Sequence, residues 1–169
     1  MPTLSDVQNR AIRNMLGTRS KTKATLAINA GSAATIKTTG TNTYSINGLD
    51  YSYAALSAQA LSADATQQAL ITGQSGFYVQ PISTTVYYVV GINAAGTVKT
   101  FQGTYTGQTF TNFVNTLGDS SIPDIGDSYC PIGYIKVVTG SATFTPATTA
   151  LDAANITFTF QDVSVLPAL

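Results

Sequence analysis

The sequence contains no histidine, no tryptophan and no glutamate, and charged residues make up only 9% of its 169 residues. Without histidine the chain cannot form a Ser-His or Cys-His nucleophile pair, an imidazole zinc site or an imidazole general base near neutral pH. Mechanisms that use aspartates alone, or tyrosine with lysine, remain open. We nevertheless expect a protein that is not an enzyme, with no catalytic residues and no cofactor.

Cysteine is almost absent too, since Cys130 stands alone. One cysteine cannot form an intrachain disulfide, and the chain is long enough to bury a core without disulfides or metals. No positively charged start precedes an apolar segment, and no apolar run reaches about 18 residues. We therefore expect a single globular domain without a secretion signal or a membrane-spanning helix.

The few charges are unevenly distributed although the formal net charge is zero. Five of the eight cations lie in the first 23 residues, where Asp6 is the one acidic residue. These cations are the candidate partner-contact residues Arg10, Arg13, Arg19, Lys21 and Lys23. The rest of the chain carries three lysines and seven aspartates, so a basic N-terminal segment precedes a mildly acidic body. A net charge near zero also permits self-association.

The basic segment could contact phosphates, because nucleic-acid affinity comes largely from Lys and Arg. No aromatic residue is interleaved with these cations to stack on bases, and the same charges can grip an acidic protein surface. We favour a protein partner over nucleic acid.

Residues 5–16, "SDVQNRAIRNML", are predicted to form a short helix. Ser5 and Gln8 have the spacing of a capping box, and Gly17 suits the helix stop. The apolar positions form a thin stripe that needs a surface to dock on: Leu4, Val7, Ala11 and Met15. Residues 17–33 are polar, small and basic, and we interpret them as an extended linker or arm. The chain thus divides into an N-terminal helix and arm, residues 1–33, and a β-rich body, residues 34–169.

The body shows the period-two pattern of strands. Asn47-Gly48 between alternating runs is a strong hairpin signal. A second hairpin is predicted over residues 83–103, and further strands over 133–139 and 155–163, the last with Ile156, Phe158 and Phe160 facing inward. Several short strands with Gly, Asn and Pro turns favour a mainly β fold, a single β-sandwich or barrel-like domain with a short N-terminal helix and an extended arm.

Two further segments of the body have helical features. Phe110, Phe113, Val114 and Leu117 recur at helical spacing before Gly118, which predicts an amphipathic helix. Residues 54–76 are expected to be irregular, with a helical turn near Asp64 to Leu70.

The stretch around Cys130 offers the remaining candidates for chemistry. A lone cysteine before Pro131 is more typical of a small buried residue than of a nucleophile. Asp119, Asp124 and Asp127 could supply oxygens to calcium, but their spacing does not match a calcium loop, and a solvated loop with no metal is favoured. A hydrolase would need a pair of aspartates, and Asp124 and Asp127 are a candidate pair without further support.

The C-terminal part of the chain has a recognisable pattern. "IPDIGDSYCPIGYIKVVTG" followed by "SATFTPATTALDAANITFTF" resembles a pattern in small structural proteins of tailed bacteriophages. Its positions are Pro123, Pro131, Ile132, Gly133, Phe144, Pro146, Thr148, Thr149, Leu151, Asp152, Ala153 and Ala154. "YSINGLDYSY" and "VVGINAAGTVKTFQG" resemble the middle of those proteins, so the likeness covers about residues 34–162. The chain departs from the pattern at Ala147, where glycine is expected, and at Cys130, where a small residue is expected.

The resemblance implies a virion protein of the capsid exterior, without a catalytic site. It would be a decoration (cement) protein between capsomers or the base of a head fibre, commonly a trimer. The expected partners are the major capsid protein and further copies in a homotrimer, and no membrane. The expected location is the outside of the virion, after assembly in the host cytoplasm. A tail component and a host- or glycan-binding module remain alternatives.

Overall fold

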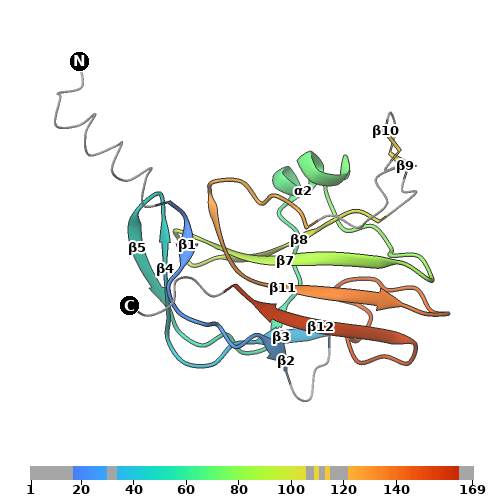
Figure 1. Ribbon diagram of the computed structural model, residues 1–169, viewed down its shortest axis with the longest axis horizontal. Coiled ribbons are helices and arrows are strands. Elements are labelled where there is room, and N and C mark those ends of the chain that lie inside the picture. The colour runs from blue at the N-terminus through green and yellow to red at the C-terminus, as the bar shows by residue number, and fades with distance from the viewer. Residues whose placement is uncertain (1–16, 30–33, 106–108, 111–112, 115–121, 164–169) are drawn as a thin grey trace.

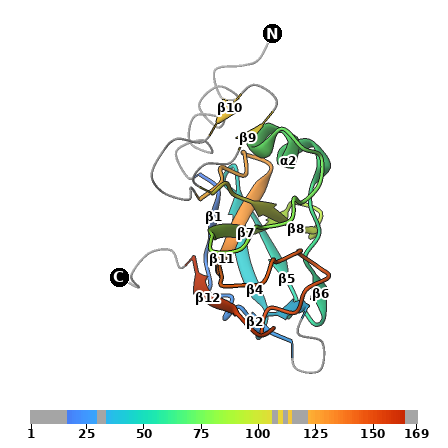
Figure 2. The same cartoon turned by 90° about the vertical axis from the view of Figure 1, so that its right-hand side faces the viewer.

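A computed structural model describes residues 17–29, 34–105, 109–110, 113–114 and 122–163. These residues are mainly β, with three antiparallel sheets, a separate two-stranded pair and one short helix (Figures 1 and 2). Because the strands of this described part do not close on themselves, the barrel-like alternative is wrong for it. The predicted N-terminal helix, with Arg10 and Arg13, lies outside the described residues.

The largest sheet has four antiparallel strands in the order β12-β11-β7-β8. The strands are β7 (Thr85–Asn93), β8 (Val98–Gln102), β11 (Tyr129–Thr139) and β12 (Ile156–Asp162). The hairpin β7–β8 and the last two strands confirm the sequence predictions. β11 begins earlier than expected, since Cys130 and Pro131 already pair with β7, and its register shifts between Pro131 and Gly133. A proline has no backbone N–H to give to the ladder, which accounts for an irregularity here.

Two smaller sheets complete the body. One has the order β1-β4-β5, from β1 (Arg19–Ser20), β4 (Asn42–Ile46) and β5 (Leu49–Tyr53). The other has the order β2-β3-β6, from β2 (Ala27–Ile28), β3 (Thr35–Lys37) and β6 (Gln59–Ala60). The β4–β5 hairpin is confirmed: Asn47 and Gly48 have φ angles of 50° and 75°, the positive values of a two-residue primed turn. Figure 1 shows this hairpin at the end of the molecule where β11 begins.

Residues 17–29 of the predicted arm are extended, but they are packed into the body. β1 pairs with β4, β2 pairs with β3, and Ala24 and Leu26 are buried. The Leu26 N–H donates a 2.9 Å hydrogen bond to Oδ1 of Asp162, which ties this segment to the far end of the chain. This segment is therefore part of the body's edge and not a free linker.

Both faces of the four-stranded sheet carry a buried apolar cluster. Its inner face meets the two smaller sheets in the main core, where the largest fully buried side chains include Tyr44, Tyr88, Ile92, Ile135, Phe144 and Leu151. Cys130 is also fully buried there, and burial raises the pKa of its thiol to about 12. The prediction that Cys130 is a small buried residue is thus confirmed. The outer face carries a second cluster of Val89, Phe101, Ile125 and Tyr129.

The helix α2 (Ala65–Thr72) confirms the helical turn predicted near Asp64. The predicted helix over residues 110–117 is wrong at its described positions. There, β9 (Thr109–Phe110) and β10 (Phe113–Val114) pair antiparallel, with Phe110 opposite Phe113. Apolar residues spaced three apart fit a tight hairpin as well as a helix, and the Thr- and Phe-rich composition favours strands.

Three fully buried glutamines join the elements around the sheet. Gln68 and Gln102 exchange hydrogen bonds of 2.8 and 3.1 Å, which dock α2 on β8. The Gln102 side-chain amide donates to the Tyr88 hydroxyl, and that hydroxyl donates to Oε1 of Gln80, both at 3.0 Å. Gln80 in turn donates to the backbone oxygen of Val137. The network therefore links α2 to β8, β7 and β11 through side chains with satisfied partners.

Candidate functional site

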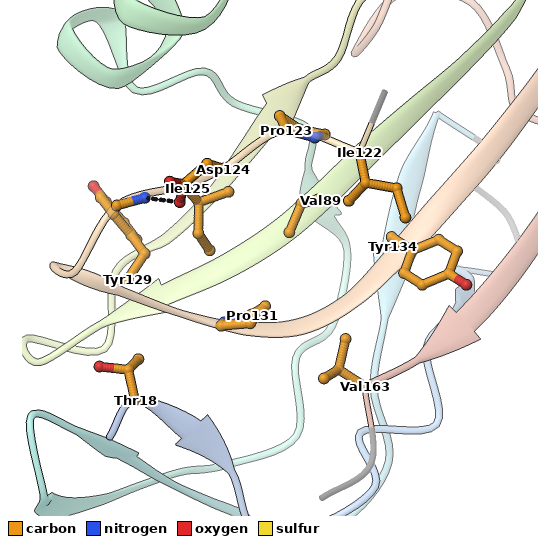
Figure 3. A pocket seen from close by; sticks show the side chains of 11 residues that line it. Thr18, Val89, Ile122, Pro123, Asp124, Ile125, Tyr129, Pro131, Tyr134 and Val163 are labelled. Carbon is orange, nitrogen blue, oxygen red and sulfur yellow. Dashed lines mark hydrogen bonds between the residues drawn. The ribbon is translucent and has the colours of Figure 1, made fainter. Parts of the chain in front are cut away.

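An open, mostly apolar pocket of about 380 Å³ lies on the outer face of the four-stranded sheet (Figure 3). We call it the outer pocket. Its lining consists of Thr18, Val89, Ile122, Pro123, Asp124, Ile125, Gly126, Tyr129, Pro131, Tyr134 and Val163. Figure 3 shows the loop side chains on one side, Thr18 and Val163 on the other, and Pro131 and Tyr134 between them.

The sheet provides the floor of the outer pocket. Tyr134 of β11 is opposite Val89 of β7 in the ladder, and alternation along the strands places both on the outer face. Gly91 allows Ile125 to lie close to the sheet, since a Cβ at this position would be 3.0 Å from Cδ1 of Ile125 and 3.1 Å from Cε2 of Phe101. The absence of a side chain at Gly91 therefore allows the loop that carries Ile125 to pack close to the sheet.

The wall is the loop that precedes β11. Pro123 and Ile125 are buried, whereas Ile122 is 54% exposed and Asp124 is exposed. Oδ1 of Asp124 accepts a 3.0 Å hydrogen bond from the Gly126 N–H, which closes a tight turn (Figure 3). The alternating burial means that the loop packs one side on the sheet and presents the other at the pocket rim.

Tyr129, which lines the outer pocket, is held by a hydrogen bond to Asp64. Tyr129 is buried, and burial together with this bond to the carboxylate raises the pKa of its hydroxyl to about 12. The pKa of Asp64 is lowered, first by the Gln67 backbone N–H and then by the Tyr129 hydroxyl. Asp64 is therefore charged and Tyr129 neutral near neutral pH, and their hydrogen bond joins α2 to β11.

A second hollow of about 430 Å³ lies on the other side of the same loop. It shares Ile122, Pro123, Asp124 and Gly126 with the outer pocket and continues over α2, where Leu70 is 77% exposed. The two hollows therefore share the loop that carries Ile122 and Pro123.

The structure places the predicted contact residues in different environments. Lys21 Nζ lies 2.6 Å from Oδ1 of Asp50, and Lys23 Nζ lies 3.8 Å from Oδ2 of Asp162. Arg19 is half-buried in β1, and among the described residues its Nε has no hydrogen-bond partner. Arg10 and Arg13 lie outside the described residues. The pairing partners are distant in sequence, so no local signal could have identified them.

Of the acidic candidates, Asp124 lines the outer pocket. Asp124 and Asp127 are exposed in the loop before β11, and Asp119 lies outside the described residues. Across the part of the chain that the structure describes, no group of three or more His, Cys, Asp or Glu side chains could hold a metal ion. In the same part, no helix is long and apolar enough to cross a membrane.

Comparisons of the chain with protein-family models, with curated proteins and with solved structures found no match. The outer pocket offers mainly apolar contacts. Its lining is apolar apart from a threonine hydroxyl, two tyrosine hydroxyls and one exposed carboxylate. Such a lining suits apolar side chains of another chain segment. Sequence reasoning missed it because the segment before Cys130 has the aspartates and glycine of a solvated loop.

Proposed function

We propose that this chain is a structural protein of a tailed-bacteriophage virion, a decoration (cement) protein that binds the outer surface of the major capsid shell and stabilises it. The proposal starts from the resemblance over residues 34–162. The observation that carries it is the place of the pattern's residues in the fold. Ile132, Phe144 and Leu151 are fully buried, and the Phe144 ring packs edge-on against Tyr88. These residues of the pattern are thus part of the packed core. This is what we expect of a sequence pattern that structural proteins share.

The departure at Ala147 supports the same reading. Ala147 has a φ of 62°, in the left-handed region that glycine adopts most easily, and the pattern has glycine at this position. The backbone conformation that the pattern requires is therefore kept although the residue has changed.

The mechanism would be adhesive. We interpret the stacked sheets as a β-sandwich, and we propose a homotrimer of such bodies on the outside of the shell. Many weak contacts per copy, repeated over a symmetric lattice, raise the stability of the shell against internal pressure. The contact residues would be Arg10, Arg13, Arg19, Lys21 and Lys23. The ion pair of Lys21 is exposed and contributes little to folding, so the lysine can exchange its partner.

Charge substitution on the arm tests this function without removing β1. The double variant Arg10→Gln/Arg13→Gln is incubated with expanded capsids that lack the protein, and bound copies are counted. We expect a several-fold loss of affinity and a weaker dependence on salt, because charged contacts are screened by ions. The matched control Lys37→Gln/Lys136→Gln removes the same charge from the body and should bind like the wild type. Full occupancy by the arm variant would contradict the proposed contact.

A further inference from the structure

Both ends of the body's described chain meet at the outer pocket. Thr18, the second described residue, lines it on one side, and Val163, the last described residue, lines it beside Tyr134 (Figure 3). Sixteen residues precede Gly17, and six follow Val163. The segments outside the described body therefore attach next to an open apolar surface.

We propose that the outer pocket binds the apolar face of residues 1–16 of a second copy of this chain. The proposal rests on the self-association in the proposed function, and it names the surface that holds the copies together. The segment has the apolar stripe that such a pocket needs, at Leu4, Val7, Ala11 and Met15. A stripe this thin contributes little to the stability of an isolated helix in water, so a surface that covers the stripe would stabilise the predicted helix.

The charges of the two surfaces are compatible. The lining of the pocket contains one carboxylate, Asp124, and no Lys or Arg, so the basic segment meets no like charge there. Arg10 and Arg13 lie off the apolar stripe at helical spacing. With the stripe in the pocket, these arginines remain available to the capsid shell.

The path of the chain at Gly17 favours a neighbour's pocket over the chain's own. β1 runs antiparallel to β4, with Arg19 opposite Ser45, so the chain traced backwards from Arg19 approaches the β4–β5 turn. Hydrogen bonds of 3.2 Å fix it there, from the Gly48 N–H to the Gly17 oxygen and from the Asn47 N–H to the Thr18 hydroxyl. The described chain thus begins at the tip of a hairpin, at one end of the body.

Disulfide trapping in the full chain tests the contact without capsids. Ala11→Cys places a thiol on the stripe, and Ile122→Cys places one at the exposed edge of the pocket. The native Cys130 does not interfere, because it is fully buried. After mild oxidation we expect covalent species of two or more chains on a non-reducing gel. The control pair Ala11→Cys/Thr148→Cys, with the second thiol exposed in the loop beyond the other end of β11, should stay monomeric.

Three other outcomes of the trapping experiment would contradict the proposal. A disulfide within one chain would show that the segment covers its own pocket. Efficient cross-linking of Leu166→Cys with Ile122→Cys, and not of the first pair, would show that the C-terminal residues fill it. No disulfide in either pair would show that neither segment lies there.

Light scattering gives a second readout that does not depend on engineered thiols. Val7→Asp/Met15→Asp places charge on the stripe, outside the described core, and should lower the oligomeric mass to that of one chain. Arg10→Gln/Arg13→Gln leaves the stripe intact and should keep the mass of the wild type even if it loses capsid binding. An unchanged mass for the aspartate variant would contradict the proposed contact, whereas the capsid assay separately tests the proposed function.

Discussion

The hydroxyl of Tyr129 donates a 2.7 Å hydrogen bond to Oδ2 of Asp64. Oδ1 of the same carboxylate accepts from the backbone N–H groups of Thr66 and Gln67 and so caps α2. One side chain thus fixes the start of the helix and the first residue of β11. Since Tyr129 also lines the outer pocket, this contact sets the position of one pocket wall.

Asp64→Asn should make the stability of the protein less dependent on acid pH. The folded-state pKa of Asp64 is lowered, so its stabilising effect is fully present above the unfolded-state pKa of about 4 and is lost as pH falls through the folded value. Asparagine keeps a good N-cap without the charge. Urea unfolding should therefore show a larger difference in stability between the variant and the wild type at pH 7 than at pH 3. An equal difference at both pH values would contradict this role.

Tyr88→Phe should destabilise the fold by about 1–3 kcal/mol, because it removes the donor to buried Oε1 of Gln80 and one of the two acceptors of the Gln102 side-chain amide. Tyr87→Phe is the matched control. Tyr87 is half-buried on the outer face, where its ring contacts Tyr134, and its loss of a hydroxyl should change stability by less than about 0.5 kcal/mol. Equal midpoints for the two variants in urea unfolding would show that the network does not contribute.

Gly91→Ala should lower the free energy of unfolding by about 1–3 kcal/mol, since the added methyl group overpacks the contact with Ile125 and Phe101. Gly76→Ala provides the control, because no atom lies within 4 Å of the position of its Cβ. Thermal unfolding of both variants measures the difference. If Gly91→Ala were as stable as the control, the loop would not pack on the sheet as described.

Ala147→Gly should stabilise the protein by about 0.5–1 kcal/mol, because relief of a left-handed alanine, worth about 1–2 kcal/mol, exceeds the entropic cost of glycine. Ala95→Gly is the control, at an exposed turn position where φ is not positive. There the entropic cost acts alone and lowers stability. The prediction fails if both variants shift the urea midpoint in the same direction.

Local patterns in the sequence predicted the hairpins and the last strand. Asn47-Gly48 specifies its turn by its own backbone preferences, and the alternation of Ile156, Phe158 and Phe160 follows directly from the pleat. The burial of Cys130 was predictable as well, because the chain has no histidine to pair with a reactive thiol and Pro131 follows the cysteine.

Features that depend on distant contacts could not be predicted in this way. Leu26 is held by Asp162, and neither residue signals the other in sequence. The buried glutamines are polar residues that look like surface positions until their partners are known. The outer pocket combines a loop with aspartates and two strands, and only the fold brings its apolar residues together.

A reconstruction of the virion, from purified particles that carry this chain, tests the proposed function most directly. The account predicts density for the β body on the outside of the shell, in groups of three, with on the order of hundreds of copies per particle. Density confined to a tail or a fibre, with only a few copies per particle, would contradict a decoration protein.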